Sequence, residues 1–246
     1  MTNLVERLST AERRMDYENV RPRDAATLLI LDRTAGGEPQ VLMGRRHTRH
    51  KFMPGKFVFP GGRVDPTDSR VPLAGDYEEP VKSKLMQAMK HRKGEARARA
   101  FAVAAIRETY EEAGVFIGRK DGAGWRAPDD FAAFAERGIS LDLSPMRFVA
   151  RAITPPRRPR RFDTRFLAVW ADAICDRLPE GTGPTGELEE LCWLSLEEAK
   201  SLELPTITLT IIEELQKRLA DDPELDPSTP VPYYHWQRKG FVREEV

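Results

Sequence analysis

Three closely spaced glutamates, Glu108, Glu111 and Glu112, are the residues best suited to chemistry. They lie in the stretch 95–113, which contains no proline and is bracketed by glycines, so the spacing predicts one helix. At 100° per residue the three side chains stand near relative angles of about 0°, 300° and 40°, on one face. Like charges at these spacings repel. A hard divalent cation such as Mg²⁺ or Mn²⁺ reverses that penalty, because it prefers oxygen ligands. The alternative is a solvated acidic face.

Two neighbouring features favour the metal site over a solvated face. Arg107 precedes Glu111 by one helical turn and is expected to orient that carboxylate. The turn Phe59-Pro60-Gly61-Gly62 comes before the helix and breaks a preceding apolar strand.

The elements around this helix predict one α/β (α+β) domain, a sandwich with a mixed sheet. Apolar runs bounded by turns or charges predict strands, and longer amphipathic stretches predict helices. The expected strands are 24–32, 40–44, 57–59, 146–154, 165–173 and 190–195, and the further helices are 129–138, a short one near 195–202, and 206–222. A basic stretch, 81–93, predicts another helix that buries Leu85, Met86 and Met89.

Composition narrows the class of protein. Among 246 residues, 39 Lys and Arg balance 39 Asp and Glu, and this zero net charge disfavours a protein that coats nucleic acid. No apolar stretch is long enough to cross a bilayer, and the first 20 residues lack the apolar core of a secretory signal. Cys175 and Cys192 form no CxxC pair, which disfavours a thiolate zinc site and favours the reducing cytoplasm.

The nonapeptide Arg107–Val115, RETYEEAGV, resembles the second half of the Nudix hydrolase box, G-x5-E-x7-R-E-U-x-E-E-x-G-U, where U is aliphatic. Within this nonapeptide only Thr109 departs from the motif, which has an aliphatic residue at that position. Phe59-Pro60-Gly61-Gly62 resembles the turn that precedes the box. Gly62 and Arg107 are 45 positions apart where the motif implies 14, so about 31 residues are inserted. The motif's first Glu falls on Asp68 counted from Gly62 and on Arg99 counted from Arg107, which leaves its role open.

The resemblance implies a Nudix-type α/β/α sandwich over residues 23–222, with the insertion at about 66–96. Residues 1–22 are expected to form a leader, and 223–246 a Pro-rich, aromatic tail. The aromatic residues of this tail are expected either to form a homodimer contact or to dock within the chain.

The family hydrolyses a nucleoside diphosphate linked to another group. By resemblance, Glu108, Glu111 and Glu112 bind Mg²⁺ or Mn²⁺, with the Gly62 carbonyl as an extra ligand and Arg107 orienting them. A metal cluster of this kind activates both the phosphorus and the attacking water. The general base varies within the family; candidates are the box glutamates, Glu111 first with Glu112 beside it, and Glu189 in the later 187–190 segment.

The segment 41–62 partly resembles the signature of coenzyme A diphosphatases, since Leu42, Arg46 and Gly55 keep its register. Lys51 stands where that signature has Arg. The predicted substrate is therefore coenzyme A or acyl-CoA, cleaved to 3′,5′-ADP and (acyl-)phosphopantetheine. The predicted substrate-binding residues are Arg46, Lys51, Arg157, Arg158, Arg160 and Arg161, because guanidinium groups suit phosphate oxygens.

Other functions remain as alternatives. One is a diphosphatase for NADH, ADP-ribose or a diadenosine polyphosphate, and another is a Nudix-fold module that senses a nucleotide without cleaving it. The expected partner is a small nucleotide diphosphate, with neither nucleic acid nor membrane, because the basic segments lack interleaved aromatic residues for base stacking.

Overall fold

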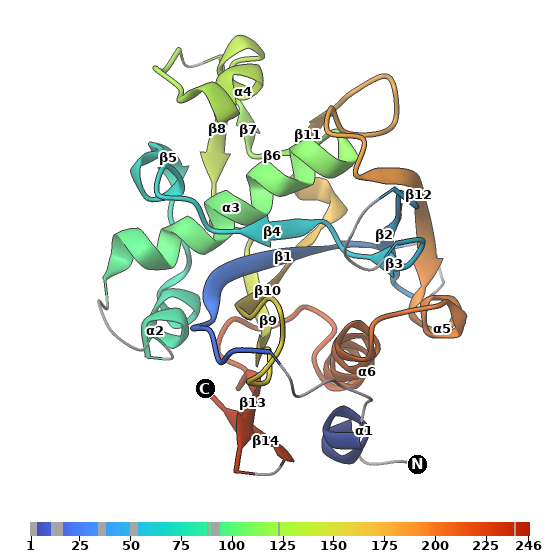
Figure 1. The fold of residues 1–246 in the computed structure, drawn as a ribbon. Helices are drawn as coiled ribbons and strands as arrows, with labels where there is room; N and C mark the ends of the chain where they lie inside the picture. Colours follow the sequence, from blue (N-terminus) through green and yellow to red (C-terminus); the bar gives the residue numbers. More distant parts are fainter. Residues whose placement is uncertain are drawn as a thin grey trace.

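The computed structural model describes residues 4–10, 17–33, 38–49, 54–87, 89, 94–122, 124–238 and 240–246. A large mixed sheet crosses the molecule in the strand order β12-β2-β1-β10-β9-β13-β14, with β3 beside β2 and β4 beside β1 (Figure 1). Its strands are β1 (Arg23–Asp32), β2 (Gln40–Arg46), β3 (Phe57–Val58), β4 (Gly61–Arg63), β9 (Arg147–Ile153), β10 (Phe162–Trp170), β12 (Leu188–Ser195), β13 (Pro232–Gln237) and β14 (Gly240–Glu245).

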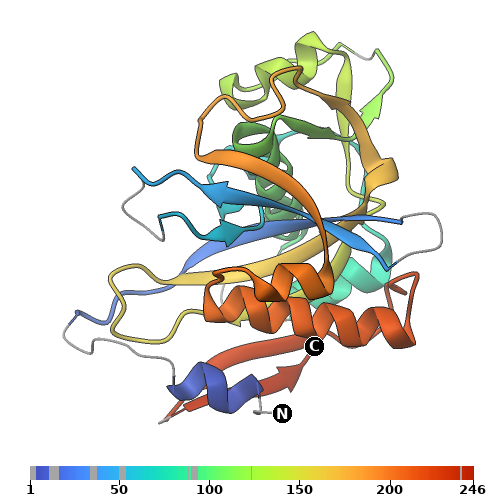
Figure 2. The ribbon, with the colours of Figure 1, turned by 90° about the vertical axis from the view of Figure 1, so that its right-hand side faces the viewer.

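Helices cover both faces of this sheet. Helix α3 (Glu95–Ala113) lies on one face, and α5 (Leu196–Ser201) and α6 (Thr206–Asp221) lie on the other (Figure 2). Strand β1 is buried on both faces: Leu28 and Ile30 pack in the cluster under α3, and Leu29 and Leu31 in the cluster under α6. This two-sided burial explains the continuous apolar run, and the predicted α/β/α sandwich is confirmed.

The predicted central helix is confirmed at both ends. Helix α3 runs over Glu95–Ala113 and ends at Gly114, whose φ of 67° is the left-handed conformation that glycine adopts without strain. The final helix, α6, also begins where predicted and ends one residue early. A hairpin, β13–β14, follows it.

The described residues of the inserted segment lie on the surface of α3. It contains a 3₁₀ turn (Asp68–Arg70), β5 (Leu73–Gly75) and α2 (Glu79–Gln87). Leu85 and Met89 are buried and Met86 is partly buried against the same core, as the amphipathic pattern predicted. Strand β5 pairs with β8 (Ile139–Asp142), which pairs with β7 (Arg119–Lys120). The remaining elements are α1 (Leu4–Thr10), β6 (Val115–Ile117), β11 (Ile174–Arg177), α4 (Ala132–Glu136) and 3₁₀ turns at Asp129–Phe131 and Ala171–Ala173.

The two ends of the chain meet on the α6 side of the sheet. The aromatic tail forms the hairpin β13–β14, and β13 adds to β9 in parallel. Tyr234 is fully buried and its hydroxyl donates to Glu214 of α6. Helix α1 packs beside β14, where Ser9 accepts the Phe241 amide at 2.9 Å. The tail's aromatic residues are therefore used inside the chain.

Candidate active site

The site is built where the β4 turn approaches the α3 helix. A Cβ on Gly62 would lie 2.3 Å from the Glu108 carboxyl carbon, so only glycine permits this approach. The neighbouring Gly61 amide donates to Glu112 at 3.0 Å. The glycine pair thus supplies both the space for one carboxylate and a hydrogen bond to another.

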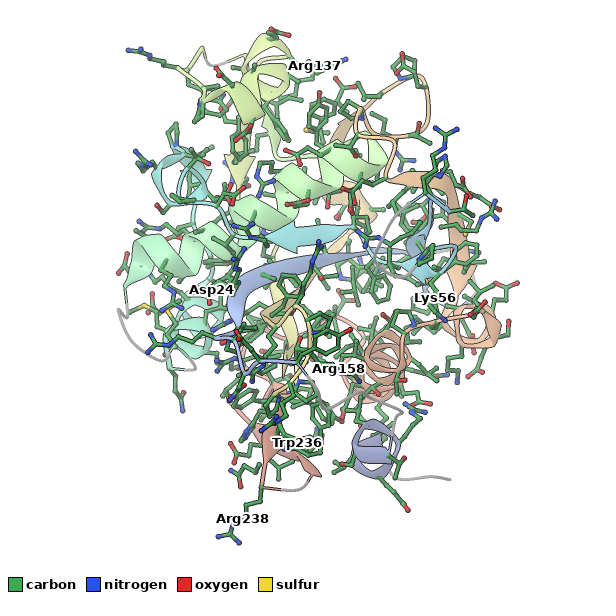
Figure 3. The ribbon with its side chains drawn as sticks, in the orientation of Figure 1. Asp24, Lys56, Arg137, Arg158, Trp236 and Arg238 are labelled. Atoms are coloured by element: carbon green, nitrogen blue, oxygen red, sulfur yellow. The ribbon has the colours of Figure 1, made fainter. Side chains whose placement is uncertain are left out.

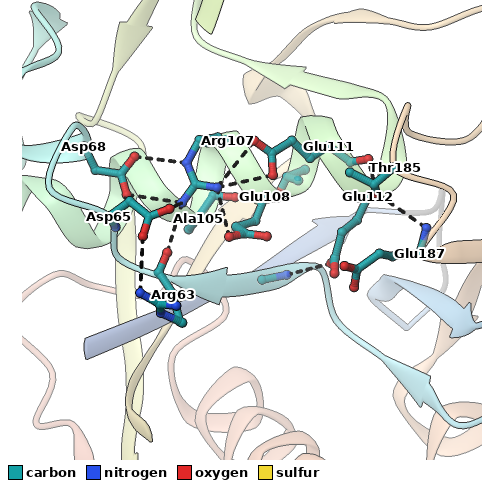
Figure 4. A network of polar contacts seen from close by, with 12 residues as sticks. Arg63, Asp65, Asp68, Ala105, Arg107, Glu108, Glu111, Glu112, Thr185 and Glu187 are labelled. Atoms are coloured by element: carbon teal, nitrogen blue, oxygen red, sulfur yellow. Dashed lines mark hydrogen bonds and ion pairs between the residues drawn. The ribbon is translucent and has the colours of Figure 1, made fainter. Parts of the chain in front are cut away.

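Arg107 organises the carboxylates from inside the protein. Its side chain is only 4% exposed, and one guanidinium nitrogen donates to Glu108 at 2.9 Å and to Glu111 at 3.2 Å. A second donates to the Arg63 carbonyl at 2.9 Å (Figure 4). The contact with Glu111 that the sequence predicted is present, and Glu108 shares the same donor.

Asp68 completes this arrangement from the inserted segment. It is fully buried and accepts from two nitrogens of Arg107, at 3.1 and 3.2 Å. Burial raises the pKa of Asp68, and Arg107 opposes that rise. Of the two positions that motif counting left open, Asp68 contacts the box arginine, whereas Arg99 pairs with Asp76 and Glu95.

Burial makes the negative charge of this site costly. It raises the pKa of Glu108 to about 7, against the opposing charge of Arg107, and it also raises the pKa of Glu111. The pKa of Glu112, whose side chain is 3% exposed, rises for the same reason, and the charge of Glu108 adds to the effect. A divalent cation bound beside such carboxyl groups stabilises their ionised form.

This donor set fits a hard cation in its chemistry, since all the side-chain ligands are oxygens. Within the described part of the chain, no three carboxylate, imidazole or thiolate groups already converge as a closed metal cage. Arg107 instead lies between Glu108 and Glu111. Of the predicted residues, Glu108, Glu111, Glu112, Gly62 and Arg107 are therefore brought together, in an open arrangement.

A loop after β11 brings a fourth carboxylate to the site. Thr185 donates its hydroxyl and amide to the Glu111 carbonyl at 2.7 and 3.1 Å, which holds the loop on the end of α3. Glu187 follows, and its charge raises the pKa of both Glu108 and Glu112. Figure 4 shows its carboxylate beside that of Glu112. The sequence analysis named the 187–190 segment but chose Glu189 within it.

Glu189 lies in a different set of contacts. It pairs with Arg45 at 3.2 Å and approaches His47 at 3.9 Å. Side chains alternate along a strand, so Arg45 and Arg46 project to opposite faces of β2. Arg46 is the one that faces the site, donating to Glu187 at 2.9 Å with Glu112 at 3.6 Å.

The other predicted substrate-binding residues are not gathered around the carboxylates in the same way. Arg161 donates to the carbonyls of Thr154 and Val20, at 3.0 and 2.7 Å, and so holds the N-terminal segment. Arg158 projects below β1 in Figure 3, whereas α3 lies above β4 in that view. Arg157 and Arg160 belong to the same loop between β9 and β10. Lys51 lies outside the described residues.

Comparisons with known proteins point to one family. A search of family profiles gives no match. Over 190 residues, the chain is 29% identical to the curated Caenorhabditis elegans protein named "Putative nudix hydrolase 7", covering 72% of this chain and 52% of that protein. The chain thus spans about half the length of this curated relative. It is also similar to the crystal structure of a NUDIX hydrolase from Alicyclobacillus acidocaldarius, with a TM-score of 0.60, 25% identity, and coverage of 85% of this chain and 96% of that one. Among the described helices, none is long and apolar enough to cross a membrane.

Proposed function

We propose that the chain belongs to the Nudix hydrolase family, as its similarity to two Nudix hydrolases supports, and that it hydrolyses the diphosphate bond of a nucleoside diphosphate linked to another group. The observation that supports this most is the grouping of Glu108, Glu111, Glu112 and Glu187 around the Gly61-Gly62 turn. Arg107 and Arg46 offset part of the negative charge of these four carboxylates, and a divalent cation would offset the rest, which favours a metal-binding role over a purely structural one.

We assign Glu108, Glu111 and Glu112 as ligands for Mg²⁺ or Mn²⁺, with the Gly62 carbonyl as a further oxygen donor. When bound, the cation withdraws charge from the phosphate oxygens and makes water a better nucleophile. Arg107 fixes two of these carboxylates, and the Gly61 amide fixes the third. Because these contacts exist before substrate binds, little reorganisation is needed during the reaction.

The roles of the remaining groups follow from their placement. Glu187 is the group proposed to accept the proton of the attacking water, in place of Glu189, which pairs with Arg45. Arg46, whose side chain is 15% exposed, is proposed to bind the diphosphate, because its guanidinium lies between Glu112 and Glu187. A substrate phosphate then replaces a carboxylate as the partner of Arg46 and leaves Glu187 available as a base.

Within this class we propose coenzyme A or an acyl-CoA as the substrate, giving 3′,5′-ADP and (acyl-)phosphopantetheine. The support is the register of Leu42, Arg46 and Gly55 with the coenzyme A diphosphatase signature.

A product-resolved assay tests both levels of the proposal. The purified chain is incubated with coenzyme A, 3′-dephospho-coenzyme A, ADP-ribose, NADH and a diadenosine polyphosphate, with Mg²⁺ or Mn²⁺ and with chelator. Metal-dependent cleavage with a higher kcat/KM for coenzyme A than for its 3′-dephospho form is expected. Equal values for these two would reject recognition of the 3′-phosphate. Absence of cleavage of every compound would reject the diphosphatase function.

A further inference from the structure

A pocket of about 200 Å³ opens at the carboxyl end of α3, beginning one residue beyond Glu112. Apart from Arg177, its lining residues are glycines or have apolar side chains, and they come from β2, the end of α3, β6, β11, the loop after β11 and β12. The lining residues are Leu42, Ala113, Gly114, Val115, Arg177, Leu178, Gly181, Leu191 and Trp193. None of the proposed roles in hydrolysis uses this space.

The pocket lies on the same face of the sheet as the carboxylates. Leu42 and Arg46 are four residues apart on β2, so their side chains project to one face, separated by roughly 13 Å along the strand. Arg46 reaches Glu112, and Leu42 lies opposite Trp193 of β12. The pocket therefore continues the site along β2, at about the reach of a nucleoside attached to a diphosphate.

Arg177 and Trp193 face each other across a gap. The guanidinium carbon lies 6.0 Å from the indole centroid, the widest such pair among the described residues. By contrast, Arg33 lies 3.9 Å from the Trp170 ring, and Arg165 lies 4.1 Å from that of Phe101. A ring sandwiched between two groups needs two separations of about 3.5–4 Å each. Because Arg177 is exposed, a shift of about 1–2 Å opens the gap enough for one planar ring.

The electrostatics of this end of α3 also select the occupant. A helix carries partial negative charge at its carboxyl end, which disfavours a phosphate there and favours N–H donors. Trp193 offers a π surface, and Arg177 adds a cation above it. A flat group with an exocyclic amine matches these features better than a phosphate.

We propose that this pocket binds the nucleobase of a nucleotide, a base with an exocyclic amine such as adenine, stacked on Trp193 and covered by Arg177. That the base belongs to the substrate rests on the proposed diphosphatase function. Base binding itself requires neither metal nor hydrolysis.

The test is calorimetric titration of the full chain with AMP and with ribose 5-phosphate in the presence of chelator. Wild type is expected to bind AMP much more tightly than ribose 5-phosphate. Trp193→Leu should weaken AMP binding at least about tenfold, the range expected for one lost stacking partner, and Trp193→Phe should retain most of it. Arg177→Ala should weaken it about two- to fivefold.

Arg33→Ala is the matched control, because it removes an exposed arginine over another tryptophan and should leave AMP binding unchanged. Arg177→Ala keeps the test decisive if Trp193→Leu does not fold, since Arg177 is exposed. Three results would each overturn base binding: no saturable AMP binding, equal affinity for ribose 5-phosphate, or wild-type affinity in both Arg177→Ala and any folded Trp193→Leu.

Failure of the inference and failure of the proposed function are distinguishable. AMP binding that depends on Trp193 in a chain without diphosphatase activity would reject hydrolysis alone. Metal-dependent hydrolysis of ADP-ribose with an unchanged KM in Trp193→Leu and Arg177→Ala, together with Trp193-independent AMP binding, would reject the nucleobase pocket alone.

Discussion

Asp68 and Arg107 form a two-point ion pair, with contacts of 3.1 and 3.2 Å, although 39 positions separate them in the chain. Asp68 begins the 3₁₀ turn of the inserted segment, and Arg107 lies on α3 directly before the carboxylates. Asp68 lies near the start of the insertion at about 66–96, and α3 begins where the insertion ends, so the pair links the start of the insertion to the helix that follows it. Because Arg107 also contacts Glu108 and Glu111, the position of the inserted segment affects how these two carboxylates are oriented.

Asp68→Asn keeps the shape of the side chain but removes its charge. We expect it to lower the free energy of unfolding by about 1.5–3 kcal/mol, the value of a hydrogen bond to a charged group. It should also lower kcat, because Arg107 then orients the carboxylates less firmly. Urea unfolding and metal-dependent turnover measure the two effects, and Asp68→Glu should recover part of each. Wild-type stability together with wild-type turnover would contradict the prediction.

Glu111→Gln should reduce kcat at least about a hundredfold while leaving the fold intact. The amide cannot carry the negative charge that holds a cation, but it occupies the same volume. The thermal unfolding midpoint without metal should not fall, because the change removes one like charge from a crowded site. Saturating Mg²⁺ should raise the midpoint of wild type and raise that of Glu111→Gln less. Near-normal turnover at saturating Mg²⁺ would show that Glu111 is not required.

Glu187→Gln and Glu189→Gln form a matched pair that identifies the general base. Both residues lie in the same short segment, but only Glu187 contacts Arg46 and affects the carboxylates of α3. We expect Glu187→Gln to lower kcat about a hundredfold or more, within the range for loss of a general base, and Glu189→Gln to have little effect. The reverse ranking would restore Glu189 as the base.

Asp163 should contribute stability that is lost in acid. It pairs with the buried Arg151 and Arg165, at 2.7 and 2.9 Å, and these contacts hold its pKa below the usual range against the effect of burial. A carboxyl with a lowered folded-state pKa stabilises the fold above its unfolded pKa of about 3.9 and loses that contribution as pH falls through the folded value.

Asp163→Asn should therefore cost about 3–5 kcal/mol at pH 7 and show a flatter loss of stability below about pH 4. Urea unfolding between pH 3 and pH 7 measures this, and Asp172→Asn, at an exposed position, is the control. Parallel pH curves for Asp163→Asn and wild type would contradict the assignment.

Tyr234 anchors the C-terminal hairpin to α6 through Glu214, which Arg243 also contacts at 2.8 Å. Tyr234→Phe should lower the free energy of unfolding by about 1–3 kcal/mol, because it leaves a buried carboxylate with one partner fewer. Equilibrium unfolding measures the change, and Tyr17→Phe, at an exposed residue, should have no effect. An unchanged stability in Tyr234→Phe would mean that Arg243 alone satisfies Glu214.

The sequence by itself determined the parts of the protein that depend on local periodicity. Helix α3 with its glycine stop, the doubly buried β1 and the shared face of the three box glutamates all follow from spacing along one segment. The RETYEEAGV match added the resemblance to the Nudix hydrolases, because a short, contiguous motif stays recognisable when residues are inserted elsewhere in the chain. The mostly polar or short strands β7, β8 and β11 gave no comparable periodic signal and were missed.

Only the tertiary structure decided the relationships between distant segments. Counting along the motif could not choose between Asp68 and Arg99, because the insertion makes the count from Gly62 and the count from Arg107 end at different residues. The ion pair with Arg107 shows that Asp68 is the one that contacts the box arginine. Nor could counting choose between Glu187 and Glu189, since the bulge between Leu188 and Glu190 changes the alternation of β12. The sequence likewise predicted only a tail after α6. In the structure this segment forms a hairpin, because β13 pairs with the edge of β9 and Tyr234 hydrogen-bonds to the buried Glu214. Such outcomes depend on which surfaces meet after folding, and the local pattern carries no record of them.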